Sequence, residues 1–221
     1  MWSFKRDIYR TENLNGTAIA LCYDPVSLSG ACSGCDVIPL ASFDYMLVRF
    51  LWNYPLNGRD LDIFVAYENT GTIYDNDYVG YAQGDAIVPS GATSTNSYLW
   101  WAQDDVNPTN PDDGIESVVI GMNKFILDNT TSGNTIDISL NAVWFNTRYD
   151  GNVSLELSTY TGGTMIQSGT NIINSGGTQV SITTNNINII NQSSSGNVIN
   201  SQNLGTITYN KLTNTGVINL I

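Results

Sequence analysis

The chain has 221 residues, of which 42% are hydrophobic and 13% are charged, and its formal net charge is −12. A chain of this length and hydrophobicity can bury a sizeable core, whereas its acidity argues against nucleic acid or an anionic membrane as a partner. It contains no histidine, which excludes Ser-His and Cys-His nucleophile pairs and every His-containing zinc site. We therefore expect a protein that is not an enzyme and requires no cofactor.

Residues 1–40 are predicted to form an extended N-terminal arm rather than a folded unit. Turn-forming pairs such as Asn15-Gly16 and Asp24-Pro25 interrupt this stretch at short intervals. We expect the arm to dock on a neighbouring subunit through the aromatic side chains of Trp2, Phe4 and Tyr9. No secretory signal is visible, and the most apolar stretch is broken by charges and cannot span a bilayer.

All three cysteines, Cys22, Cys32 and Cys35, fall in this arm. Cys32 and Cys35 have CxxC spacing, but a structural zinc site needs four ligands and the chain offers three thiolates and no imidazole. An odd number of cysteines without a visible signal peptide predicts reduced thiols in a bacterial cytoplasm. Their role is left open.

From residue 41 onward the pattern is typical of strands, with runs rich in Val, Ile, Thr and Tyr separated by Gly, Asn and Asp clusters. The expected strands are residues 45–52, 61–67, 98–102, 117–120, 135–145 and 152–160. Residues 121–128 are expected to form one short helix. The spacing predicts an all-β chain with an antiparallel, jelly-roll-like β-sandwich over residues 41–184.

Residues 185–221 are expected to add Asn-rich closing strands that end in a hairpin over residues 205–221. From Ile166 to Ile221 the chain has no acidic residue and one basic residue, Lys211. Uncharged strands of this kind need pairing partners, because an open edge invites association. We expect residues 177–184 to close the same sandwich, and the last hairpin either closes it too, contributes to an oligomeric fibre or forms a disordered tail.

A group of carboxylates is the strongest candidate for a functional site. Asp60 and Asp62 are two residues apart and, within a strand, project to the same face. Asp104 and Glu116 add acidic groups at loop positions, and hard oxygen ligands of this type suit calcium. These four residues are the candidate metal ligands.

Two other interpretations of the carboxylates stay open. Each Asp can instead cap a turn through its own hydrogen bonds, with Arg59 or Arg148 neutralising one of them. An acid pair for glycoside hydrolysis can be drawn from Asp60, Asp62 and Glu116, although nothing in the spacing selects that chemistry.

Aromatic residues suggest a second function, a carbohydrate-binding module. Trp100 and Trp101 are adjacent, so on a strand they point to opposite faces, and we expect one in the core and the other exposed. Trp101, Tyr78 and Tyr81 are the candidate stacking surfaces for a sugar, and Trp2 is a further one.

Several motifs occur in a fixed order along residues 41–221. Residues 49–52 (RFLW) are followed by residues 58–63 (GRDLDI), and the later motifs are residues 98–105 (YLWWAQDD), 114–118 (GIESV), 142–145 (AVWF), 160–165 (YTGGTM) and 207–210 (ITYN). This ordered set resembles the DLD β-sandwich domains of virion proteins from tailed bacteriophages. The amino-acid composition, rich in Asn and without His, is similar to that of structural proteins of crAss-like gut phages.

The resemblance implies an exposed virion component, such as a head fibre, a capsid decoration protein or a tail-associated protein, assembled in the host cytoplasm. Its implied partners are other virion proteins, further copies of itself and a host surface glycan. It also implies that Asp60, Asp62, Asp104 and Glu116 converge at one end of the sandwich. Two positions depart from the pattern: Ile63 replaces a small polar residue, which weakens a metal role, and Asp105 replaces an amide, which favours a cation.

Overall fold

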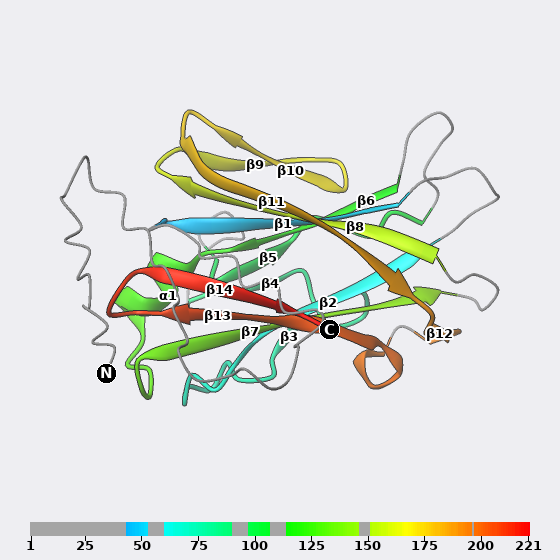
Figure 1. Cartoon of the computed structure of the whole chain (residues 1–221), viewed down its shortest axis with the longest axis horizontal. Helices are drawn as coiled ribbons and strands as arrows, with labels where there is room; N and C mark the ends of the chain where they lie inside the picture. The colour runs from blue at the N-terminus through cyan, green and yellow to red at the C-terminus, as the bar shows by residue number, and fades with distance from the viewer. Residues whose placement is uncertain (1–42, 53–59, 90–96, 107–113, 146–150, 196) are drawn as a thin grey trace, which may run out of the picture. The chain divides into compact units, whose positions relative to one another are not determined.

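A computed structural model of the chain describes residues 43–52, 60–89, 97–106, 114–145, 151–195 and 197–221. In these segments the chain forms two β-sheets that pack face to face, together with one short α-helix (Figure 1). The predicted all-β antiparallel sandwich is therefore confirmed. The expected N-terminal arm, with Trp2, Phe4, Tyr9 and the three cysteines, lies outside the described residues.

The first sheet, here called sheet I, has the spatial strand order β11-β8-β1-β6-β5-β4, and all its pairs are antiparallel. Its strands are β1 (Tyr45–Trp52), β4 (Ala86–Ile87), β5 (Leu99–Trp101), β6 (Gly114–Ile120), β8 (Gly151–Thr161) and β11 (Thr178–Ile189). β1 lies between β6 and β8, so sheet I forms only when segments far apart in the sequence have come together.

Sheet II has the order β14-β13-β7-β2-β3, and β12 pairs in parallel with β7. Its strands are β2 (Leu61–Glu68), β3 (Tyr78–Gly80), β7 (Thr135–Phe145), β12 (Gln192–Ser193), β13 (Gln202–Asn210) and β14 (Thr215–Leu220). Outside the two sheets are α1 (Met122–Asp128), the hairpin of β9 (Thr164–Ser168) and β10 (Asn171–Ser175), and the 3-10 helix η2 (Val198–Asn200).

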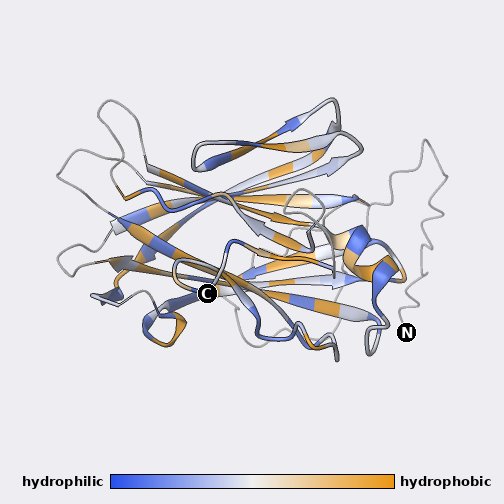
Figure 2. Ribbon diagram, turned by 180° about the vertical axis from the view of Figure 1, so that it is seen from behind, coloured by the Kyte–Doolittle hydropathy of each residue, from blue (hydrophilic) through white to orange (hydrophobic). Residues whose placement is uncertain are grey.

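The main core lies between the two sheets. Side chains alternate between the two faces of a strand, so every second residue of the long strands belongs to the core. Figure 2 shows the matching alternation of hydrophobic and hydrophilic residues along several strands. Phe50 of β1 and Ile63 of β2 belong to this inward set, and Trp52 meets Trp144 edge to face with ring centroids 6.2 Å apart. The alternation thus fixes which side chains of β2 and β6 can face the other sheet.

A second apolar cluster covers the outer face of sheet I. Leu47, Trp100 and Tyr160 from the sheet pack there with Met165 of β9 and Ile172 of β10. The β9–β10 hairpin therefore acts as a partial third layer, which contacts residues of β1, β5, β6 and β8. Strands beneath the hairpin are buried on both faces.

The Asn-rich C-terminal residues belong to the same sandwich. β11 runs through residues 184 and 185 to pair along the whole of β8, and the β13–β14 hairpin pairs with β7. β11 and the β13–β14 hairpin are therefore both closing strands of the sandwich. The interpretation of the last hairpin as a disordered tail is wrong. None of the described helices has the length and apolarity needed to cross a membrane.

Candidate functional site

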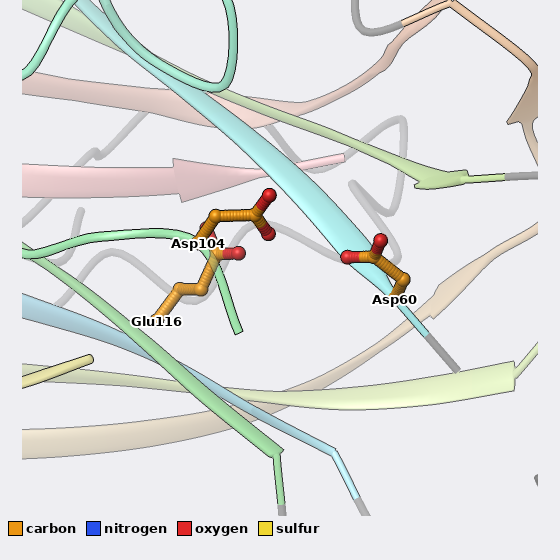
Figure 3. A group of neighbouring side chains, drawn as sticks. All are labelled: Asp60, Asp104 and Glu116. Atoms are coloured by element: carbon orange, nitrogen blue, oxygen red, sulfur yellow. The ribbon is translucent and has the colours of Figure 1, made fainter. Parts of the chain in front are cut away.

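Three carboxylates meet between the two sheets. Asp60 directly precedes β2 of sheet II, whereas Glu116 lies in β6 and Asp104 follows β5, both of sheet I. One oxygen from each residue lies within 4.8 Å of one from each of the others, and Figure 3 shows the three side chains pointing toward one another. Three of the four predicted ligands are therefore brought together.

Glu116 is fixed by hydrogen bonds from its own sheet. The Trp101 indole N–H donates to its Oε2 at 3.0 Å, and the Asp105 backbone N–H donates to its Oε1 at 3.2 Å. Asp105 in turn accepts a hydrogen bond from the Ile115 backbone N–H at 2.9 Å. These contacts hold the segment after β5 against β6, and this places Asp104 beside Glu116.

Asp60 is positioned by sheet II. Its backbone carbonyl accepts a hydrogen bond from the Phe145 N–H at 2.9 Å, which extends the pairing of β2 and β7 by one residue. Its side chain is only 9% exposed, and its Oδ1 has no hydrogen-bond partner. The Asp104 Oδ1 also lacks one.

Asp62 is not part of the close trio. It alternates with Leu61 and Ile63, which face the other sheet, so its side chain leaves the opposite face of β2. Asp60 directly precedes β2, and the expectation that Asp60 and Asp62 share a strand face stays a prediction. Asp62 is nevertheless 1% exposed, and neither of its oxygens has a hydrogen-bond partner.

Burial and mutual repulsion favour the protonated forms of these acids. Burial, followed by the charges of Asp104 and Asp62, raises the pKa of Asp60 to about 8. Burial, followed by the charge of Asp104, raises the pKa of Asp62 to about 7. Burial is also the largest cause of the raised pKa values of Asp104, Asp105 and Glu116. The site thus concentrates more negative charge than it can hold without a proton or a cation.

The basic residues of the described segments form their contacts away from these carboxylates. Arg49 pairs with Glu156, Lys124 pairs with Asp128, and the Lys211 ammonium donates to Thr131. Arg59 and Arg148, the candidate neutralising residues, lie outside the described residues.

The predicted sugar-stacking surface at Trp101 is wrong. Trp101 is 5% exposed in the inter-sheet core, and Trp100 is also 5% exposed because the β9–β10 hairpin covers the other face. Tyr81 is half-buried against Phe145, with ring centroids 6.0 Å apart. Tyr78 is half-buried too, and its hydroxyl lies 3.5 Å from the Glu68 carboxylate.

An open groove lies instead on the outer face of sheet I, where α1 and the β9 hairpin flank Trp100. It offers about 510 Å³, and its lining includes Tyr45, Asp44 and Asn123. The Asn123 amide donates to the Asp44 carboxylate at 2.6 Å, so the polar side of the groove is partly ordered. The groove could not be predicted from the sequence, because its walls come from four separate segments.

Strand β11 forms an edge of sheet I. Within the described segments β8 is its strand partner on one side, and no strand pairs on the other. Its twelve residues carry no charge, and Val180 and Ile182 are exposed. Such an edge offers unpaired backbone N–H and C=O groups to another strand.

Comparison of the chain with models of protein families, with curated proteins and with solved structures gave no match. The function is therefore argued from the residues and geometry described above.

Proposed function

We propose that this chain is a non-enzymatic structural component of a tailed-bacteriophage virion. It serves as a head fibre, a capsid decoration protein or a tail-associated protein. Residues 1–40 dock on the particle, and the sandwich is exposed for contact with other subunits or with the host surface. The ordered motifs that resemble phage DLD domains support this role, and the β11 edge is the structural observation that carries it.

The β11 edge suits pairing with a second copy of the chain. Natural edge strands are commonly blocked by Lys, Pro or a short length, whereas β11 is twelve residues long and has neither residue. The chain carries a net charge of −12, but residues 166–221 contain one charged residue. Two copies can therefore meet along β11 without bringing their acidic groups together.

Light scattering during size-exclusion chromatography tests the self-association. The wild-type chain is expected to exceed the mass of one subunit as its concentration rises. Ile182→Lys places a charge on the edge strand and is expected to keep the chain monomeric, because like charges would face each other across the pairing. Ile73→Lys, at a more exposed isoleucine outside the strands, is the control and should associate as wild type does. A wild-type chain that stays monomeric at high concentration would contradict the proposal.

The virion location needs a separate measurement. Antibodies raised against the purified chain should label intact particles of the phage that encodes it, and mass spectrometry should find the chain in purified particles. Its absence from such particles would contradict a virion role even if the chain self-associates.

A carbohydrate-binding module is the second candidate, and the groove beside Trp100 is the observation that favours it. Sugars bind beside an aromatic side chain, where amides donate hydrogen bonds to their oxygens and carboxylates accept hydrogen bonds from their hydroxyls. Asn123, Asp44 and Tyr45 supply these groups. A glycan array should therefore give a signal that Asn123→Ala weakens and Ile73→Lys leaves unchanged. An array without signal removes this candidate.

A further inference from the structure

We propose that Asp60, Asp104 and Glu116 bind a calcium ion that joins sheet I to sheet II. This inference goes beyond the virion role and does not depend on it. Ca²⁺–oxygen distances are about 2.3–2.6 Å, so two oxygens on one ion lie no more than about 5 Å apart. The three carboxylates satisfy this condition, because one oxygen of each lies within 4.8 Å of the others.

Unpartnered buried oxygens are a second observation that points to a ligand. Asp60 is nine-tenths buried, its Oδ1 has no hydrogen-bond partner, and its carboxylate points at Asp104 and Glu116 (Figure 3). Asp104 Oδ1 is also buried without a partner. A buried polar atom without a partner costs about 1–3 kcal/mol, and a cation among these oxygens would satisfy them together.

The surrounding charge favours a cation as well. Asp62 is 1% exposed, lacks hydrogen-bond partners and acts electrostatically on both Asp60 and Glu116. Asp105 adds a further carboxylate next to Asp104. In the described segments no Lys or Arg contacts these acids.

Calcium fits the donor set better than the other common metals. All three ligands are carboxylates, which are hard oxygen donors, and His and Cys ligands that select zinc are absent from the trio. Mg²⁺ demands near-octahedral geometry at short distances, whereas Ca²⁺ accepts irregular oxygen shells. The hydrogen bonds from Trp101 and Asp105 orient Glu116, as outer groups orient ligands in known metal sites.

The position of the trio defines the effect of the ion. Asp60 belongs to sheet II, and Asp104 and Glu116 belong to sheet I. These residues are far apart in an unfolded chain, so calcium binds the native state preferentially and stabilises it by mass action.

Thermal unfolding of the full chain provides the first test. The Tm in CaCl₂ should exceed the Tm in EDTA by roughly 5–10 °C when calcium is about 100-fold above its Kd. MgCl₂ at the same concentration should have a much smaller effect. Asp60→Asn should abolish the calcium response and also raise the Tm in EDTA, because it removes a buried acid that is unfavourable to ionise beside other carboxylates while keeping the side-chain shape. Asp77→Asn, at an exposed aspartate in the turn before β3, is the matched control and should respond as wild type does.

Terbium luminescence provides a second readout that does not depend on stability. Tb³⁺ replaces Ca²⁺ in oxygen sites and emits when it receives energy from a nearby excited tryptophan. The Trp101 indole bonds directly to Glu116, so bound Tb³⁺ should emit on tryptophan excitation. CaCl₂ should displace this emission, and Asp60→Asn should reduce it at least 10-fold.

Three results would overturn the proposal. They are an unchanged Tm across millimolar CaCl₂ with no terbium emission, a calcium response that Asp60→Asn leaves intact, and a response to MgCl₂ equal to that to CaCl₂. The first would mean that protons or a basic residue neutralise the trio, the second that calcium binds elsewhere, and the third that the site does not select calcium.

Discussion

Arg49 ties the β9–β10 hairpin to the outer face of sheet I. Its guanidinium forms an ion pair with Glu156 of β8 and donates to the Asn171 side chain and the Ile172 carbonyl of β10, each at 3.0 Å. A planar guanidinium is suited to several partners at once. The residue therefore holds two strands of the sheet and one strand of the hairpin.

Replacing Arg49 by Met should destabilise the chain. The change removes three charge-assisted contacts and leaves Glu156 partly buried without its partner, at a cost of about 2–3 kcal/mol. Urea unfolding of the variant should show a lower midpoint with an unchanged m value.

The control for Arg49→Met is Lys124→Met, which removes the more exposed Lys124–Asp128 pair of α1. Exposed pairs contribute little to stability, so this variant should unfold close to wild type. Equal behaviour of the two variants would show that Arg49 does not hold the hairpin.

At the scale of elements, sequence periodicity predicted the long strands well. The predicted bounds of β1 and β7 match the structure, because both strands are dense in β-branched, aromatic and other apolar residues and begin or end at turn residues. The sequence did not predict β3, β4 and β12, because a strand of two or three residues is too short to show a hydrophobic alternation. The β9–β10 hairpin was not predicted either. One of Trp100 and Trp101 was therefore expected to be exposed, whereas the hairpin buries Trp100 and the core between the sheets buries Trp101.

The candidate metal site was predictable only in part. The residue types and the resemblance to phage domains predicted Asp60, Asp104 and Glu116 as metal ligands, and these three residues lie together in the structure. Their meeting depends on how two sheets pack, which the spacing of residues along one chain does not encode. Asp62 lies outside the trio although it is only two residues from Asp60.

The pairing of β1 with β6 gives a prediction at the scale of elements. The register places Trp52 opposite Gly114, and a Cβ atom at Gly114 would lie 2.0 Å from the Trp52 indole. Gly114→Ala should therefore lower stability by about 1–3 kcal/mol, because the core has no room for the methyl group. Trp52→Phe makes room, so urea unfolding of the double variant should show less destabilisation than the two single changes added. Additive effects would contradict the close packing of Trp52 on Gly114.

At the scale of the whole molecule, charge is divided between two regions. Five of the 20 acidic residues, Asp60, Asp62, Asp104, Asp105 and Glu116, form one interacting group, whereas residues 166–221 are almost uncharged. We propose that the first region binds protons or a cation in the folded state and that the second associates through β11. Stability and assembly are therefore expected to respond to different solution conditions.

Proton binding gives the chain an unusual dependence on pH in the absence of calcium. The folded-state pKa values of about 8 for Asp60 and about 7 for Asp62 lie above the ordinary value of 3.8. From about pH 4 to about pH 8 the folded state therefore holds protons that the unfolded state has released, and its stability should fall as pH rises. The raised pKa values of Asp104, Asp105 and Glu116 act in the same direction, whereas the lowered pKa of Asp128 acts only at more acidic pH.

Thermal unfolding in EDTA, from about pH 5 to about pH 8, measures this slope. The Tm of the wild-type chain should decrease across the range, and Asp60→Asn should flatten the decrease because, of Asp60 and Asp62, Asp60 has the higher pKa. Asp77→Asn should keep the wild-type slope, since its carboxylate is exposed and lies outside the cluster. A Tm that rises with pH would mean that the clustered acids are ionised and compensated in the folded chain, and the buried trio would then need a basic partner from the segments around it.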